Sequence, residues 1–446
     1  MTNQDPNANV MNGAGRGPAA VSPEVKAAIH RRLLETLDFI EARRMTPEQL
    51  QRECSHRLEG LLSEHHCPLS TPEKAQMIRE LMDEIFGLGP LEEFLRDPAI
   101  SDVLVNGPNQ IYIERQGVLH RTEACFRDDN HLMLVIQRIA ANVGRRIDEA
   151  SPMLDARLAD GTRVNAIIPP LSLVGPSMSL RRFANMPLKA DRLVELGSIA
   201  PAMSDFLEAC VRCRISLLVS GGTGTGKTTM LNILSQWIPE NERVITIEDA
   251  AELQLQREHV VRLETRPPNI EGRGEVTQRE LVRNSLRMRP DRIIIGEVRG
   301  PEALDMLQAM NTGHDGSMTT VHANNPRDAL RRVENMVSMA GLNYPVHVIR
   351  QQMSSAIQLL VHLSRLTGGA RKIMTISEIT GTEGDAVCLQ ELFAFRQTGV
   401  SADGHAVGFF EACGVRPQLL NRLIAEGVKM GEDFFQKRVL STKITH

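Results

Sequence analysis

The spacing of apolar residues divides the chain into segments of different periodicity. Residues 1–22 show no periodic pattern and are rich in Asn, Gly, Ala and Pro, so we expect a disordered tail there. Over 23–88, apolar residues recur every three or four positions in blocks that open with Ser22-Pro23, Thr46-Pro47 and Thr71-Pro72. Because proline suits the first turn of a helix, this pattern predicts a small helical bundle.

Beyond the bundle, the pattern changes to short alternating runs separated by turn residues. Gly89-Pro90 interrupts the helical spacing, and one further helical run follows at about 130–144. Strand-like runs lie near 103–105, 111–113, 118–120, 163–168 and 177–183. We therefore expect an α+β domain over 89–184, followed by a hinge or linker over 185–200.

From 201 to 446, apolar runs too continuous for half-exposed strands alternate with helical runs. The runs at 215–220, 244–247 and 292–295 are of this kind. Strands buried on both faces and alternating with helices are typical of a parallel sheet, so we predict an α/β domain. The tail from about 385 reads as strands followed by a last helix near 417–438, which makes a C-terminal extension.

One motif in this domain indicates phosphate chemistry. The segment 221–228 reads G-x-x-x-x-G-K-T between the run at 215–220 and a helical run, the context of a phosphate-binding P-loop. With average glycine usage, the spacing alone arises by accident in about one chain of this length in a hundred. Lys227 would reach the β- and γ-phosphates, and Thr228 would place its hydroxyl on Mg²⁺. The predicted nucleotide-binding residues are Gly222, Thr223, Gly224, Thr225, Gly226, Lys227, Thr228 and Thr229.

Polar residues at the ends of three further strands are candidate catalytic groups. Glu248 follows the run at 244–247, and Glu297 follows 292–295 with Gly296 in the place of the usual aspartate. His314 and His322 flank a third run. Since ligands sit at the carboxyl ends of strands in such sheets, we expect these side chains beside the phosphates. Either glutamate could deprotonate the attacking water, and each histidine taken alone is more often structural.

Composition excludes several other classes. A net charge of −4 gives no field that would attract nucleic acid, and 3% aromatic residues argue against a groove that stacks bases. No run of 18 apolar residues is present, so no membrane span is predicted. Cys210 and Cys213 form a C-x-x-C without a second pair, which indicates packed helix residues and no zinc site.

Taken together, these motifs resemble those of the secretion ATPases of type II secretion, type IV secretion and type IV pili. Within that family the chain looks most like the CpaF/TadA branch, which powers Tad-type pilus assembly. The Gly296-Glu297 pair that follows the run at 292–295 is typical of this family. The matching segments are the Walker A motif (221–228), the Asp box (247–252), the Walker B motif (293–297), the His box (312–322), and two stretches of the N-terminal domain (100–107 and 155–165).

The resemblance implies a PAS-like N-terminal domain, a RecA-like C-terminal domain, and a homohexamer that binds ATP and Mg²⁺ between the two. It implies a cytoplasmic motor, associated peripherally with the inner membrane of a bacterium and acting on inner-membrane platform proteins. Arginines that match positions closing on the phosphates are Arg157, Arg163, Arg181 and Arg182. The alternative for the last two is a solvated surface pair.

Two other functions are compatible with the P-loop alone. A RecA-like nucleic-acid translocase or helicase is disfavoured by the low aromatic content, the mild acidity and the His box. A slow regulatory switch for guanine nucleotides is disfavoured because no N-K-x-D motif is present. Whether the motor extends or retracts a pilus, and which pilin it serves, is not decided by the sequence.

Overall fold

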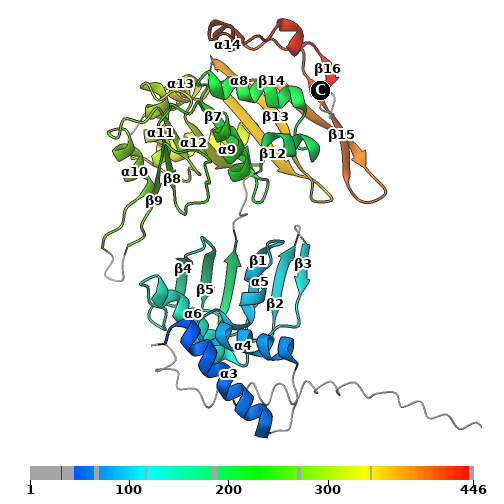
Figure 1. Ribbon diagram of the computed structural model, residues 1–446. Coiled ribbons are helices and arrows are strands. Elements are labelled where there is room, and N and C mark those ends of the chain that lie inside the picture. Colours follow the sequence, from blue (N-terminus) through cyan, green and yellow to red (C-terminus); the bar gives the residue numbers. More distant parts are fainter. Residues whose placement is uncertain are drawn as a thin grey trace, which may run out of the picture. The chain divides into compact units, whose positions relative to one another are not determined.

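The computed structural model describes residue 32 and residues 45–64, 70–115, 118–182, 188–268, 273–341, 344–384 and 386–440. The chain forms two compact units, Met1–Asn185 and Met186–His446, which we describe separately (Figure 1). The predicted tail at 1–22, the first predicted helix apart from residue 32, and residues 185–187 of the expected hinge lie outside the described residues.

The first unit begins with two helices, α3 (Pro47–Glu64) and α4 (Thr71–Ile85). A reciprocal cap opens α3, because the Thr46 N–H donates to Gln49 Oε1 (2.9 Å) and the Gln49 N–H donates to Thr46 Oγ1 (3.3 Å). The helices share a small core that includes Leu50, Leu58 and Leu81. The apolar spacing noted in the sequence therefore corresponds to the faces that these helices bury against each other.

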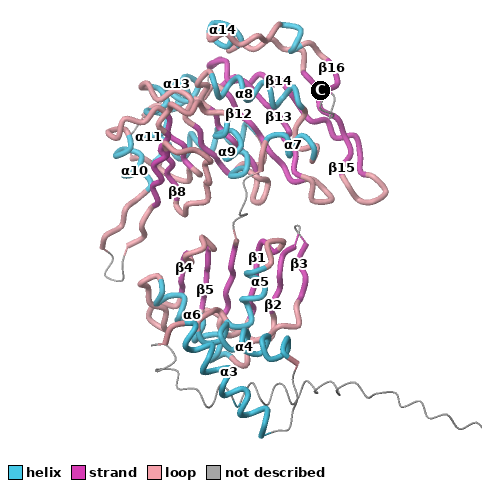
Figure 2. Tube along the Cα trace, in the orientation of Figure 1, coloured by secondary structure: helices cyan, strands magenta, loops and turns pink. Residues whose placement is uncertain are grey.

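A six-stranded antiparallel sheet forms the rest of this unit, in the order β3-β2-β1-β6-β5-β4 (Figure 2). Helix α6 (Asp129–Asn142) packs against it through Leu132, Val135 and Ile139, which share a core with strand residues such as Val103. The short helices η1 (Gly89–Leu91) and α5 (Glu92–Arg96) precede the sheet. Its strands are β1 (Ile100–Asn106), β2 (Ile111–Arg115), β3 (Val118–Arg121), β4 (Met153–Arg157), β5 (Arg163–Ile167) and β6 (Ser177–Arg181).

The second unit is built on a ten-stranded sheet in the order β16-β15-β14-β13-β12-β7-β11-β10-β8-β9. The strands from β12 to β9 in this order run parallel, and those from β13 to β16 are antiparallel. The predicted mixed α/β class is thus confirmed. The strands are β7 (Leu217–Gly221), β8 (Val244–Glu248), β9 (Val260–Glu264), β10 (Arg292–Ile295), β11 (Met318–His322), β12 (Leu359–Arg365), β13 (Arg371–Glu383), β14 (Ala386–Val400), β15 (Ala406–Ala412) and β16 (Arg438–Leu440).

Helices cover both faces of this sheet (Figure 1). Along β7, Leu217 and Val219 join one apolar core, whereas Leu218 between them joins another. This alternation explains why the strand is apolar at consecutive positions. The first core includes α7 (Ala190–Glu195), α8 (Pro201–Arg212) and α9 (Lys227–Gln236); the second includes α10 (Gln278–Ser285), α11 (Glu302–Asn311), α12 (Pro326–Ser338) and α13 (Val346–Ala356).

Two sequence-based expectations for this unit can be compared with the structure. The predicted helix near 417–438 is wrong, because α14 spans only Leu420–Ala425 and is followed by Gly427 at φ +87°, which ends a helix. The chain then forms η2 (Glu432–Phe435) before β16. Cys210 and Cys213 are buried, and the described residues contain no group of three His, Cys, Asp or Glu side chains able to hold a metal ion.

Candidate functional site

The P-loop lies between the end of β7 at Gly221 and the start of α9 at Lys227. Gly224 (φ +70°) and Gly226 (φ +96°) take left-handed backbone conformations that favour glycine. A Cβ on Gly221 would lie 2.6 Å from the Leu363 carbonyl oxygen, so the strand end also requires glycine. The loop leads directly into the N-terminus of α9, where free backbone N–H groups and the helix dipole favour an anion.

Two side chains at the start of α9 are held by neighbouring carbonyl and carboxylate groups. Lys227 is buried and donates from Nζ to the Gly222 carbonyl at 2.9 Å. Burial lowers the pKa of Lys227, and the nearby Glu297 carboxylate acts in the opposite direction. Thr228 Oγ1 donates to Glu252 Oε2 at 3.3 Å. The ammonium and the hydroxyl that the sequence singled out thus stand beside two acids at one end of the sheet.

Glu297 and His322 meet at the carboxyl ends of β10 and β11. The Glu297 carboxylate contacts His322 Nε2 at 3.2 Å through Oε1 and Arg299 at 3.0 Å through Oε2. The pKa of His322 is lowered, first by burial and then by the charge of Lys227, so its imidazole favours the neutral form. His322 lies opposite Gly221 in the parallel pairing of β11 with β7. Glu297, His322 and the P-loop are therefore brought together.

The structure explains why glycine replaces the usual aspartate after β10. A Cβ on Gly296 would lie 2.9 Å from Glu248 Cγ, inside ordinary van der Waals contact. The space beside the backbone is occupied by Glu248, which ends the neighbouring strand β8. The departure noted in the sequence is therefore a packing requirement imposed by an acid on the adjacent strand.

Glu248 is more enclosed than a solvated catalytic base. Its side chain is 3% exposed, and Oε2 accepts hydrogen bonds from the backbone N–H groups of Glu252 (2.7 Å) and Leu253 (2.8 Å). Oε1 is buried and has no hydrogen-bond partner within the described residues. Burial raises the pKa of Glu248 to about 7. Glu248 thus shapes the turn that presents Glu252 to Thr228.

Sequence reasoning did not single out Glu252, although it lies in the Asp box. Its carboxylate accepts the hydrogen bond from Thr228, the hydroxyl expected at Mg²⁺. The available signal was the third acid of the 247–252 segment, four residues after Glu248.

Replacing Glu248 with glutamine is expected to stabilise the protein at alkaline pH. The pKa is raised in the folded state, so folding binds the proton more tightly, and stability is lost as pH rises from about 4.5 through about 7. The free energy of unfolding should therefore fall by about 3 kcal/mol between pH 4 and pH 8 because of this group. Glu248→Gln resembles the protonated acid, so urea unfolding of the variant should lose most of this pH dependence. An unchanged pH profile would contradict the assignment.

The structure does not bring His314 to this group. His314 precedes β11, at the amino end of the strand, and its carbonyl accepts a hydrogen bond from Ser317 Oγ at 2.7 Å. His322, at the carboxyl end of the same strand, is the histidine beside Glu297. The two histidines therefore lie beyond opposite ends of β11, and only His322 is at the end where Glu297 lies.

Three of the four candidate arginines form a row across the sheet of the first unit. Arg157 on β4 lies opposite Arg163 on β5, which lies opposite Arg181 on β6. Asp102 on β1 is the next residue in the row, with 3.4 Å between its Oδ1 and Arg181 Nε. Residues directly opposite in antiparallel strands share a face, and like charges so placed repel one another. The row therefore concentrates positive charge on one face.

Arg182 is engaged differently. Its guanidinium donates to the backbone carbonyls of Asp97 and Ile100, the latter at 3.4 Å. These contacts connect the residue after β6 with the turn that precedes β1 and with the first residue of β1. Arg182 therefore stands apart from the row formed by the other three.

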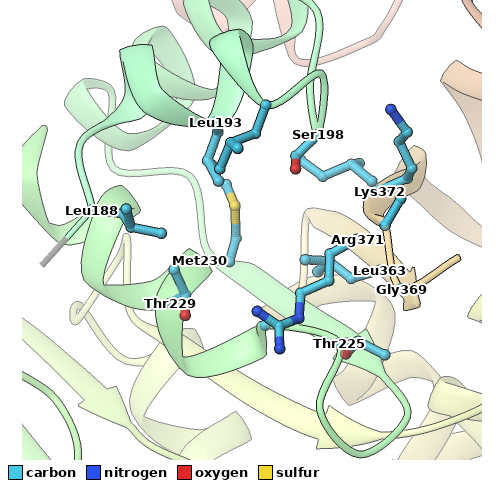
Figure 3. A pocket seen from close by; sticks show the side chains of 14 residues that line it. Leu188, Leu193, Ser198, Thr225, Thr229, Met230, Leu363, Gly369, Arg371 and Lys372 are labelled. Atoms are coloured by element: carbon cyan, nitrogen blue, oxygen red, sulfur yellow. The ribbon is translucent and has the colours of Figure 1, made fainter. Parts of the chain in front are cut away.

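A cavity of about 250 Å³ lies against the P-loop and the first turn of α9 (Figure 3). Its wall is mostly aliphatic, and Arg371 extends along it toward the loop (Figure 3). Such a wall with a few polar groups suits a flat heterocycle better than a phosphate. The aliphatic lining residues are Leu188, Leu193, Leu196, Met230, Leu363 and Ile373, and the polar ones include Ser198, Thr225 and Thr229.

No helix within the described ranges has the length and apolar character needed to cross a bilayer.

Comparison with known proteins identifies the family. Residues 84–401 match the family described as "Type II/IV secretion system protein". The chain belongs to this family. It is 39% identical over 338 residues to a putative conjugal transfer protein of Mycobacterium tuberculosis, covering 74% of this chain and 94% of the relative.

Two further similarities concern type IV secretion. The type IV secretion system protein PtlH of Bordetella pertussis is 34% identical over 315 residues, which cover 64% of this chain and 92% of PtlH. Among solved structures, the VirB11 ATPase from the Brucella suis type IV secretion system is 29% identical, with a TM-score of 0.36 over 64% of this chain and 94% of that chain.

Proposed function

We propose that this family member is a Mg²⁺-dependent ATPase motor of the CpaF/TadA branch, which serves Tad or type IV pilus assembly or type II/IV secretion. The observation that carries the proposal is the P-loop at the β7–α9 junction, with Lys227, Thr228, Glu252, Glu297 and His322 around it. The membership of the chain in a secretion family supports the mechanical half of the proposal.

The nucleotide would bind across the P-loop with its base in the aliphatic cavity. Residues 222–229 would hold the phosphates through backbone N–H groups and Lys227, and the Thr228 hydroxyl would hold Mg²⁺. Thr225 and Thr229 line the cavity, so the proposed site for the nucleobase adjoins the proposed site for the phosphates. The metal would neutralise charge on the β- and γ-phosphates.

We assign the general base to a carboxylate with a free approach to the phosphates. Glu297 is partly exposed and contacts His322, whose imidazole favours the neutral form. Glu248 is buried, and its carboxylate accepts hydrogen bonds from two backbone N–H groups. Glu252 holds the hydroxyl expected at Mg²⁺. Glu297 would therefore orient and deprotonate the attacking water, Glu252 would fix Thr228, and Glu248 would position Glu252.

The arginine row of the first unit would supply charge to the terminal phosphate. Arg157, Arg163 and Arg181 form one basic face on what we propose is a PAS-like domain, and the second unit is proposed to be RecA-like. In a homohexamer, ATP held between the domains would draw them together, and loss of the γ-phosphate would release them. The motor would then act on inner-membrane platform proteins from the cytoplasmic side.

Turnover by the purified full chain tests this proposal. We expect phosphate release from ATP that requires Mg²⁺, falls to background in excess EDTA, and does not increase when single-stranded DNA is added. GTP measured in parallel distinguishes an ATPase from a guanine-nucleotide switch. Stimulation by DNA would favour a translocase, and the absence of hydrolysis in the intact oligomer would remove the motor.

A further inference from the structure

The first three residues of β13 (371–373), which follow the turn at 366–370, contact two segments that are distant in sequence. On one side, Arg371 Nε donates a 2.9 Å hydrogen bond to the carbonyl of Gly224 in the P-loop. On the other side, the Ile373 N–H donates to the Ser198 carbonyl at 3.0 Å, and Lys372 Nζ donates to the Gly197 carbonyl. The side chains of Arg371 and Lys372 diverge accordingly (Figure 3).

The Arg371 contact fixes a peptide unit that matters for phosphate binding. The carbonyl of Gly224 and the N–H of Thr225 belong to one planar, trans peptide group, so they point in opposite directions. A donor that holds the carbonyl from outside the loop therefore also sets the direction of the Thr225 N–H. Because a guanidinium polarises the carbonyl that it contacts, it also makes the N–H a stronger donor toward an anion.

Lys372, the residue after Arg371 in β13, is held in place by several contacts. The ammonium of Lys372 lies 5.5 Å from the ring centre of Phe395 and 5.8 Å from that of Phe410, so cation–π contacts add to its bond with Gly197. The turn itself is closed by a 2.7 Å hydrogen bond from the Leu366 N–H to the Ala370 carbonyl. A short, internally bonded turn transmits displacement better than an open loop.

Gly197 and Ser198 belong to the segment that leads from the first unit into the second. They lie between α7 and α8, and Ile199 beside them is buried in the core that also includes α9. Residue 186 is where the second unit begins. A contact with Gly197 and Ser198 therefore acts on the part of the second unit through which the chain connects to the first.

We propose that Arg371 is a positioning residue that couples occupancy of the P-loop to the connecting segment 188–200. A phosphate bound by the Thr225 N–H pulls on the same peptide group whose carbonyl Arg371 holds, and the adjacent Lys372 and Ile373 pass the change to Gly197 and Ser198. This inference rests on the proposed nucleotide binding and adds a route by which bound nucleotide reaches the connection between the units.

Hydrogen exchange of the full chain tests the coupling. We expect saturating ATP analogue to slow exchange of backbone amides in 190–200 of the wild type. In Arg371→Ala this slowing should be lost at a concentration that fills the site, and affinity for a fluorescent ATP analogue should fall about tenfold, as for loss of one charge-assisted hydrogen bond. Arg371→Lys, which keeps a donor of the same charge, should restore part of both effects.

The matched control is Arg331→Ala, an arginine exposed on α12, which should behave as the wild type. Nucleotide-dependent slowing that persists in Arg371→Ala would overturn the proposal, as would a wild type that binds the analogue without any change in 190–200. Failure of the wild type to bind the analogue at all would instead remove the nucleotide assignment.

Discussion

Replacement of Lys227 by alanine is expected to lower ATP turnover by at least about 10³-fold, close to the background of the assay. The ammonium is buried beside the loop and donates to the Gly222 carbonyl, so it is already directed along the phosphate path. Its lowered pKa reflects burial, and a bound triphosphate would favour the charged form that the burial opposes. The rate of phosphate release from ATP, measured at several enzyme concentrations for the variant and the wild type, checks this prediction.

The control for this variant separates catalysis from folding. Lys227 starts α9, so the alanine form should retain the helix, and its thermal unfolding should stay close to that of the wild type. Lys429→Ala removes an exposed lysine of the C-terminal extension that has no part in the proposed site, and it should keep wild-type turnover. Unchanged hydrolysis in Lys227→Ala would remove the P-loop assignment.

The sequence was most informative where local spacing determines local geometry. The segment 221–228 is short, and its glycines adopt the left-handed conformations that a phosphate loop requires at Gly224 and Gly226. The strands that lead to Glu248 and Glu297 are mostly apolar runs, so their carboxyl ends could be placed at one edge of the sheet.

The sequence was least informative where a residue's role depends on a neighbouring strand. Glu248 and Glu297 follow similar apolar runs, yet Glu248 lies over Gly296 and is enclosed, whereas Glu297 reaches His322. His314 and His322 flank the same run in the sequence, and the sequence pattern did not show that only His322 lies at the carboxyl end of that strand. The aliphatic cavity joins residues 188–230 to residues 363–373, and no local pattern indicates such a pairing.

The arginine row could be recognised in sequence only as four separate positions. In the structure, Arg157, Arg163 and Arg181 are direct cross-strand neighbours, which adds a physical argument. Three guanidinium groups on adjacent strands repel one another, and a polyanion placed against them would relieve that repulsion. At one end of the row, Asp102 places an opposite charge beside Arg181.

Replacement of Arg163, the central member of the row, by alanine is therefore expected to lower kcat for ATP by about 10³-fold or more, with little change in ADP affinity. The reason is that the guanidinium would neutralise charge on the γ-phosphate, which ADP lacks. Stability should change little, by no more than about 1 kcal/mol, because Arg163 is a half-buried residue outside the apolar core of this unit.

Arg182→Ala provides the contrast within the same unit. Its guanidinium donates to the backbone carbonyls of Asp97 and Ile100, so its loss should lower the melting temperature. Turnover per folded protein should stay close to that of the wild type. Steady-state hydrolysis, ADP titration and thermal unfolding of both variants distinguish the two roles. Wild-type kcat in Arg163→Ala would contradict the phosphate role of the row, because no other basic group on β5 is paired in register with both Arg157 and Arg181.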